Sequence, residues 1–271
     1  MCKNFRLLSF AMVIAFISLT AITSADTNVC GDVNCDVTCN VADAVWIINY
    51  VFAGGYNPCD TDGDGNPDCY ADCPPIVTDY DGNTYFVVKI GDQCWMAQNL
   101  KVTHYRNGDP IPNVTDSAEW ENLTTGAYCE YANDPANVAT YGRLYNWYAV
   151  DDIRNIAPEG WHVPTDAEWQ TLVDYLGGSS VAGGKLKEAG TTHWNPPNTG
   201  ATNESGFTAL PGGYRYGNGY FHHMGYYAFF WSSTELDSNY AWLRILGYDG
   251  SQVGRNYGYK HSGFSFRCVR D

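Results

Sequence analysis

A long apolar run occurs only near the beginning of the chain, from Leu7 to Ile22. Basic residues precede it and three small residues, at 23–25, follow it. This order of basic, apolar and small segments is typical of a secretory leader, and the run is short for a membrane span of ~20 residues. We therefore expect residues 1–25 to be a cleaved signal peptide and the mature chain to be secreted or cell-surface associated, not transmembrane. An uncleaved membrane anchor is the alternative.

Later in the chain, hydrophobic residues recur at helical spacing in two segments, 139–150 and 165–176. In the first, the apolar face consists of Tyr141, Leu144, Tyr145 and Tyr148; in the second, it consists of Trp169, Leu172, Val173 and Leu176. Thr165 and Glu168 have the spacing of a capping box at the start of the second segment. We predict two helices whose apolar faces lie in the core.

Strand-like segments surround these helices. Residues 84–90 follow an Asp-Gly turn and are rich in β-branched and aromatic residues, which predicts a strand. After residue 199, glycines interrupt the aromatic residues at short intervals, so short strands and surface loops are expected there. We predict an α+β domain over 76–271, with two helices and a second half rich in strands and loops.

The segment before this domain is acidic and rich in cysteine. Residues 26–75 contain nine of the 30 acidic residues and no Lys or Arg. Cleavage of the leader would remove two of the 15 basic residues and leave 13, for a net charge of −17, which argues against nucleic acid as a partner. Six cysteines lie in the segment, at 30, 35, 39, 59, 69 and 73. In an exported chain they indicate a small disulfide-stapled module, whose pairing the sequence does not determine.

Two runs in this module have oxygen-bearing residues at the spacing of calcium-binding loops. The predicted ligands are Asp32, Asn34, Asp36, Thr38 (through its carbonyl), Asn40 and Asp43 in the first run, and Asp60, Asp62, Asp64, Asn66, Asp68 and Asp72 in the second. Calcium prefers six to eight such hard oxygen ligands. Ca²⁺ is therefore the predicted cofactor, and solvated acidic turns are the alternative.

Residues 44–52 are apolar and compatible with a helix after the first run. Residues 31–36 and 40–50 resemble one half of a type I dockerin. Residues 60–74 are similar to a thrombospondin type 3 calcium repeat. Dockerins contain two halves that both contribute to docking on a cohesin, and only one is recognisable here. The resemblance implies a calcium-stabilised module at 26–75, with a cohesin-type scaffold as a possible partner.

The large domain resembles the Fibrobacter succinogenes major paralogous domain family over nearly its full length. The matching segments are DGNTY at 81–85, WMAQNL at 95–100, ATYGRLYNW at 139–147, GWHVPT at 160–165, NESGF at 203–207, LPGGYR at 210–215, WSSTE at 231–235 and GFSFRCVRD at 263–271. The family is similar to C-type-lectin-like domains, so the resemblance implies that fold. Family members often have Cys where this chain has Ala157. The resemblance therefore implies that Cys268 bridges Cys94 or Cys129.

Catalysis has little support in the sequence. The closing segment is also similar to formylglycine-generating-enzyme domains, but that chemistry uses a reactive cysteine pair and Cys268 has no cysteine neighbour. The six histidines form no metal motif. On a strand the rings of His222 and His223 would point to opposite faces, but we expect the two residues to be exposed in a loop. Glu204 and Glu235 are a weak candidate for a glycosidase pair. We expect no catalytic residues.

Binding has positive support, because Tyr, Asn and Ser alternate between 214 and 261 as they do in antibody paratopes. The candidate ligand-binding residues are Tyr216, Asn218, Tyr220, His222, Tyr226, Tyr240, Tyr248, Asn256, Tyr257 and Tyr259. About half of the tyrosines in this region are expected to be buried, together with Trp231, Trp242, Phe264 and Phe266.

Three functions follow from these observations. The first is a secreted, non-enzymatic protein that binds a polysaccharide or protein ligand through an aromatic surface. The second is an accessory subunit of an extracellular polysaccharide-degrading complex, docked through the dockerin-like module. The third, and least supported, is an enzyme of the formylglycine-generating type.

Overall fold

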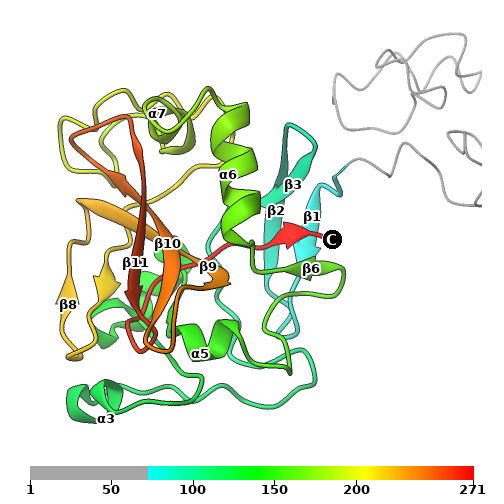
Figure 1. Ribbon diagram of the computed structural model, residues 1–271, viewed down its shortest axis with the longest axis vertical. Coiled ribbons are helices and arrows are strands. Elements are labelled where there is room, and N and C mark those ends of the chain that lie inside the picture. The colour runs from blue at the N-terminus through cyan, green and yellow to red at the C-terminus, as the bar shows by residue number, and fades with distance from the viewer. Residues whose placement is uncertain (1–72) are drawn as a thin grey trace, which may run out of the picture. The chain divides into compact units, whose positions relative to one another are not determined.

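The computed structural model describes residues 73–271, and the two ends of this range meet in one sheet (Figure 1). Its first three strands are antiparallel neighbours: β1 (Ile76–Thr78), β2 (Thr84–Ile90) and β3 (Gln93–Met96). The last strand of the chain, β12 (Val269–Arg270), lies between β3 and β6 (Trp161–His162). The strand predicted at 84–90 is confirmed as β2.

The second sheet is an antiparallel meander in the order β11-β10-β9. Its strands are β9 (Tyr227–Glu235), β10 (Tyr240–Gly247) and β11 (Val253–Tyr259). Two short strand pairs complete the strands of the described range: β4 (Tyr128–Cys129) with β5 (Leu144–Tyr145), and β7 (Tyr214–Arg215) with β8 (Phe221–His222). Since these strands occur beside helices, the α+β class is confirmed, as is the strand-rich second half.

The helix predicted after Thr165 is α6 (Asp166–Tyr175), and the capping box between Thr165 and Glu168 is formed. In Figure 1, α6 lies between the two sheets. The ring of Trp169 on its buried face lies 4.8 Å from Trp95 of β3 and 5.6 Å from Phe230 of β9. The apolar face predicted from the sequence therefore fills the space between the sheets.

The helix predicted at 139–150 is wrong. The chain forms instead a short helix, α4 (Val138–Tyr141), then β5, then a second short helix, α5 (Trp147–Val150). Gly142 separates them with a φ of +73°, and a Cβ there would lie 2.7 Å from the carbonyl oxygen of Leu100. A left-handed glycine ends the helix, so the apolar residues of this segment reach the core through three elements.

The remaining helical turns of the described range are short. They are α3 (Ser117–Glu121), the 3-10 turns η2 (Tyr131–Asn133) and η3 (Pro135–Asn137), and α7 (Ala182–Leu186). No helix within residues 73–271 has both the length and the apolar character that a membrane crossing needs.

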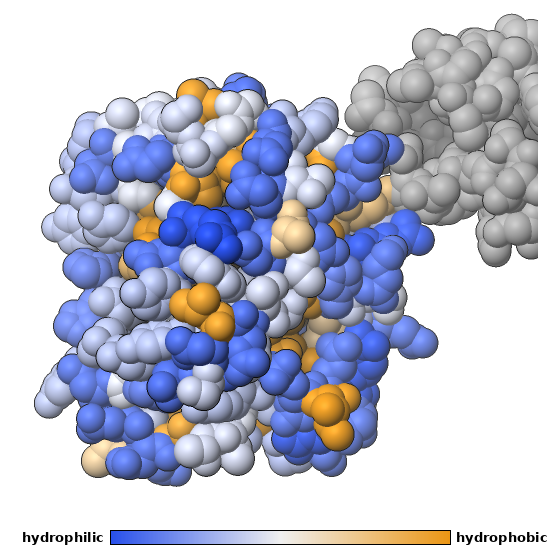
Figure 2. All heavy atoms as spheres, in the orientation of Figure 1, coloured by the Kyte–Doolittle hydropathy of each residue, from blue (hydrophilic) through white to orange (hydrophobic). Residues whose placement is uncertain are grey.

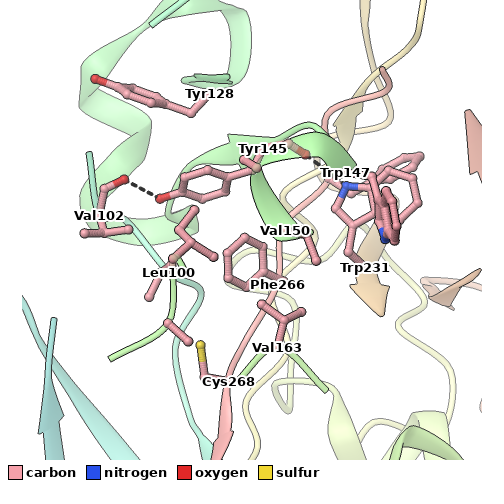
Figure 3. Close-up of a cluster of buried hydrophobic side chains, with 14 of the residues drawn as sticks. Leu100, Val102, Tyr128, Tyr145, Trp147, Val150, Val163, Trp231, Phe266 and Cys268 are labelled. Carbon is pink, nitrogen blue, oxygen red and sulfur yellow. Dashed lines mark hydrogen bonds between the residues drawn. The ribbon is translucent and has the colours of Figure 1, made fainter. Parts of the chain in front are cut away.

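The largest core cluster joins β5, α5, β9 and the C-terminal segment (Figure 3). The hydroxyl of Tyr145 donates to the carbonyl of Val102 at 2.7 Å, and the carbonyl of Tyr145 accepts from the indole of Trp231 at 2.9 Å. The ring of Tyr145 also lies 5.0 Å from that of Phe266. Residue 145 thus ties together segments that are far apart in the sequence.

The cysteine pairing differs from that implied by the family resemblance. Cys94 of β3 is bonded to Cys73, whereas Cys129 and Cys268 are free and buried. Cys268 packs in the main core cluster beside Met96, and Cys129 belongs to a separate cluster. The prediction that Cys268 bridges Cys94 or Cys129 is therefore wrong, and Cys73 is part of the large domain. The predicted signal peptide at 1–25 and the predicted calcium ligands from Asp32 to Asp72 lie outside the described residues.

Candidate ligand-binding surface

The β7–β8 hairpin has one inward and one outward side. Arg215 pairs with Phe221 and points inward, while Tyr214 pairs with His222 on the outer side. The connecting turn contains Gly219, whose φ is +84°. The side chain of Asn218 stabilises the turn because it accepts a hydrogen bond from the backbone N–H of Tyr220 at 3.1 Å. The hairpin therefore leaves Tyr216, Tyr220 and His222 exposed, while Phe221 packs against a core cluster.

A buried arginine anchors this hairpin. Arg215 is fully buried, and its guanidinium donates to the carbonyls of Val114, Thr115 and Gly219 at 2.6 to 2.9 Å. It also lies over the ring of Trp120 at 4.4 Å. These contacts connect the hairpin to the segment before α3, so Tyr214 and Tyr216 are held on a fixed support.

The two adjacent histidines lie on the same side of the hairpin. The rings of His222 and His223 are 5.6 and 5.7 Å from Tyr214 and 6.0 Å from each other. Both histidines are exposed, as expected, and their rings share one side because β8 ends at His222 and His223 has a left-handed φ of +66°. The alternation of a strand does not extend across such a residue.

Two aromatic cross-strand pairs lie on the second sheet. Tyr240 of β10 is directly opposite Tyr259 of β11, and Trp242 is opposite Tyr257. Direct partners in an antiparallel pair have their side chains on the same face. The ring centroids of Tyr240 and Tyr259 are 4.6 Å apart, and a hydrogen bond to Tyr259 raises the pKa of Tyr240 to about 12. The four rings form a ladder on one face of the sheet.

The hairpin and the ladder are connected through ring contacts. Tyr214 lies 6.4 Å from Tyr216, and Tyr216 lies 6.2 Å from Tyr259. We call the resulting series the aromatic path; it consists of Tyr214, Tyr216, Tyr259, Tyr240, Tyr257 and Trp242. Figure 2 views the molecule in the orientation of Figure 1, and hydrophobic residues appear on that side only as small separate patches.

The tyrosines of this region are more accessible than the sequence suggests. The nine tyrosines considered there were expected to be about half buried, yet four are exposed, five are half-buried and none is buried. They are Tyr214, Tyr216, Tyr220, Tyr226, Tyr227, Tyr240, Tyr248, Tyr257 and Tyr259. Trp231, Phe264 and Phe266 are buried as predicted, but Trp242 is half-buried. These accessible rings carry most of the candidate surface.

The ten predicted ligand-binding residues are not all in one place. Tyr216, Tyr240, Tyr257 and Tyr259 belong to the aromatic path, and Asn218, Tyr220 and His222 belong to the hairpin. Asn256 adjoins the path on β11, where its side chain accepts from the N–H of Tyr257 at 2.8 Å. Tyr226 and Tyr248 form an edge-to-face pair at 5.1 Å near the other end of β10.

Sequence reasoning missed several residues of this surface. Tyr214, His223 and Trp242 contact the predicted residues, and half-buried Phe229 packs 4.6 Å from Tyr214. The signal for Trp242 was present, since it is two residues from Tyr240 and strand alternation places both on one face. The contacts of Tyr214 and His223 depend on the hairpin geometry, which local patterns do not contain.

An arginine beside the ladder is already engaged in an ion pair. Arg255 lies 3.5 Å from the ring centroid of Trp242, and its guanidinium bonds to the carboxylate of Asp166 at about 3 Å. The buried Arg244 shares that carboxylate, and the two arginines hold the pKa of Asp166 below its usual value against the opposing effect of burial. The ring of Trp242 in the ladder thus lies beside an arginine that is already paired with Asp166.

The thiols and carboxylates that were considered as catalytic candidates are either buried or paired with lysines. Burial raises the pKa of the Cys129 thiol to about 12, and it also raises that of Cys268. Glu204 is paired with Lys185 at 2.7 Å, and Glu235 is paired with Lys260. Each carboxylate therefore has its own lysine partner. Within residues 73–271, no three His, Cys, Asp or Glu side chains are arranged to hold a metal ion.

Comparison with known proteins finds one family. The model of the Fibrobacter succinogenes major domain matches residues 88–270, which extend from β2 to β12 and include the whole candidate surface. No curated protein and no solved structure matches the chain.

Proposed function

The chain belongs to the Fibrobacter succinogenes major domain family, and we propose that it is a secreted, non-enzymatic binding protein whose aromatic path holds a polysaccharide. One observation carries this proposal: none of the nine tyrosines between 214 and 259 is buried, and most of their rings are in mutual contact at the surface. A set of core tyrosines would be inaccessible to a ligand.

The chemistry of the surface suits a sugar. Tyrosine and tryptophan rings offer apolar faces on which the C–H groups of a pyranose stack, and a tyrosine hydroxyl can hydrogen-bond a sugar hydroxyl. His222 adds a polar group beside the rings of Tyr214 and Tyr216. Because Tyr has only two side-chain torsions, ordering it upon binding costs little entropy.

The arrangement of the cysteines supports a binding role over an enzyme of the formylglycine-generating type. Such chemistry needs an accessible thiolate, and the thiolate is the reactive form of cysteine. Cys268 is fully buried and its pKa is raised by burial, so it is protonated at neutral pH. Cys268 therefore does not offer the reactive thiolate that an enzyme of the formylglycine-generating type would need.

The rest of the proposal depends on the sequence. The leader at 1–25 would export the chain, the domain would have a C-type-lectin-like fold, and the module at 26–75 would bind Ca²⁺. The dockerin-like run favours a second candidate function, an accessory subunit held on a cohesin of a polysaccharide-degrading complex. Calcium-dependent binding of the full mature chain to a type I cohesin would support this second function, and equal binding in chelator would refute it.

The main proposal is tested with the mature full chain on an array of plant and microbial glycans. Tyr216→Ala and Tyr257→Ala should each lose binding, because both side chains are exposed members of the path. Tyr175→Ala is the matched control, since Tyr175 is 66% exposed on α6 and outside the path. If these tyrosines bind a protein and no glycan, the ligand is a protein and not a polysaccharide. Glycan binding that survives both substitutions would overturn the proposed site.

A further inference from the structure

The aromatic path is long relative to a single sugar. Its consecutive ring centroids are 4.6 to 6.4 Å apart over five steps. Each step is similar to the length of one pyranose residue in a chain. A monosaccharide could therefore contact only one or two of these rings at a time.

The path also advances along the strands and does not turn back on itself. Tyr240 and Trp242 are two residues apart on β10, and Tyr259 and Tyr257 are two residues apart on β11, in register with them. Side chains at i and i+2 point to the same face and are separated by two residue rises, about 7 Å. Tyr214 and Tyr216 add a further stretch at the hairpin end. Within the ladder the path crosses between the two strands, so the rings offer successive levels of contact: Tyr214, Tyr216, the Tyr240–Tyr259 pair and the Trp242–Tyr257 pair.

The ring planes of the path change direction at nearly every step. Successive interplanar angles are 80°, 81°, 35°, 79° and 89°. A flat crystalline polysaccharide surface would need coplanar rings to contact several of them at once. A single soluble chain can rotate about its glycosidic bonds and follow rings whose orientation varies.

The charges near the path favour an uncharged chain. Arg244 and Arg255 share the carboxylate of Asp166. The exposed carboxylate of Asp237 accepts from the backbone N–H of Tyr240, so the charges of the two signs beside the ladder balance. The whole protein has a formal net charge of −15, so an acidic polysaccharide is repelled at long range.

From these four observations we infer that the site takes a single, uncharged polysaccharide chain along several consecutive sugar subsites. This inference rests on the proposed function and specifies its ligand. Affinity should rise with chain length, because each added sugar residue reaches another ring. Short oligosaccharides, crystalline surfaces and uronic-acid polymers should bind weakly.

The test measures the affinity of the full mature chain for uncharged gluco-, xylo- and manno-oligosaccharides, from disaccharide to hexasaccharide, by calorimetry. For the series that binds, the hexasaccharide should bind about tenfold or more tightly than the disaccharide. A tenfold difference in affinity corresponds to ~1.4 kcal/mol, which contacts with one or two further rings would supply. Trp242→Ala and Tyr214→Ala, at the two ends of the path, should reduce this length dependence. Tyr175→Ala should retain it.

Tyr257→Ala provides a further path variant. Its side chain is 52% exposed, so the substitution should disturb folding less than those at half-buried Trp242 and Tyr214. Each variant is checked by thermal unfolding before binding is measured. Equal affinity for the disaccharide and the hexasaccharide would overturn the inference while leaving the proposed function intact, as would a preference for crystalline or uronic-acid polymers. No binding to any glycan would instead refute the proposed polysaccharide ligand, and the inference with it.

Discussion

The ring of Tyr216 in the β7–β8 hairpin lies 6.2 Å from the ring of Tyr259 at the end of β11, with an angle of 81° between their planes. This contact joins two aromatic groups that belong to separate sheets. Neither side chain is buried, so the contact contributes to a continuous surface more than to the core. Six predictions follow from this surface and from the packing of the described domain.

A double-mutant cycle at this contact should show coupling in ligand binding. Tyr216→Ala and Tyr259→Ala should each weaken polysaccharide affinity about tenfold, and the double variant should lose less than the sum because both rings contact the same ligand chain. The stability of Tyr216→Ala should change by less than ~0.5 kcal/mol, since the side chain is exposed. Calorimetry and denaturant unfolding measure the two effects. Strict additivity in binding would show that the rings act at separate sites.

Replacement of Lys187 by Met should destabilise the domain. The buried ammonium donates to the carbonyls of Thr199, Gly247 and Gly250 at 2.8 to 3.1 Å, and methionine would leave these three acceptors without a donor. Unsatisfied buried acceptors cost about 1–3 kcal/mol each before relaxation or hydration, so we expect a net loss of about 2–4 kcal/mol in urea unfolding. An unchanged midpoint would mean that water replaces the ammonium.

The same lysine should affect stability at high pH. Burial lowers the pKa of Lys187 to about 8 from an ordinary 10.5, so the unfolded chain binds more protons than the folded chain between these values. Stability therefore rises with pH across this window, and the contribution is lost as pH falls through about 8. The difference in stability between the native protein and Lys187→Met should grow from pH 8 to pH 10.5. A constant difference would contradict this pKa.

Gly142→Ala should be strongly destabilising for a single added methyl group. Gly142 has a φ of +73°, and a Cβ would lie 2.7 Å from the Leu100 carbonyl and 2.8 Å from the Cβ of Asn99. Strain and overpacking together should cost about 2–4 kcal/mol. Gly160→Ala is a matched control, since its φ of +74° is similar and no atom lies within 4 Å of a Cβ there. If both variants lose the same stability, backbone strain alone accounts for the effect.

The cysteines should differ sharply in their reactivity. Mass spectrometry after alkylation under native conditions should find Cys73 and Cys94 linked, and Cys129 and Cys268 unmodified until the chain is unfolded. Loss of the link through Cys73→Ser and Cys94→Ser should cost about 2–4 kcal/mol. Rapid alkylation of Cys268 in the folded protein would contradict its burial and reopen the question of a reactive thiol.

The capping box of α6 should make the domain sensitive to acid. Hydrogen bonds from His162 and Thr165 outweigh burial and lower the pKa of Glu168 to about 2 from an ordinary 4.5. Its contribution to stability is present above pH 4.5 and is lost as pH falls toward 2. Glu168→Gln should therefore be less stable than the native protein at pH 6, and the two should converge near pH 2. Parallel unfolding curves across this range would refute the predicted pKa.

Local patterns were sufficient for some elements. The capping box of Thr165 and Glu168 and the apolar face of Trp169 predicted α6, because a helix and its cap depend on residues within one or two turns. The β-branched run at 84–90 predicted β2 for the same reason. In the segment 139–150, the apolar spacing fitted a helix, but Gly142 was already a signal against it. The Leu100 carbonyl, which is distant in sequence, lies so close to residue 142 that no Cβ fits there.

The sequence by itself determined the composition of the candidate surface: tyrosines, asparagines and histidines between 214 and 261, within a family that the comparison confirms. Only the tertiary structure decided which of them lie together. The alternation of β10 and β11 sets one face of rings, but the contact of Tyr216 with Tyr259 and the pairing of Cys73 with Cys94 depend on how separate strands pack. Such packing minimises the exposed apolar area of the whole domain, and no short segment contains that information.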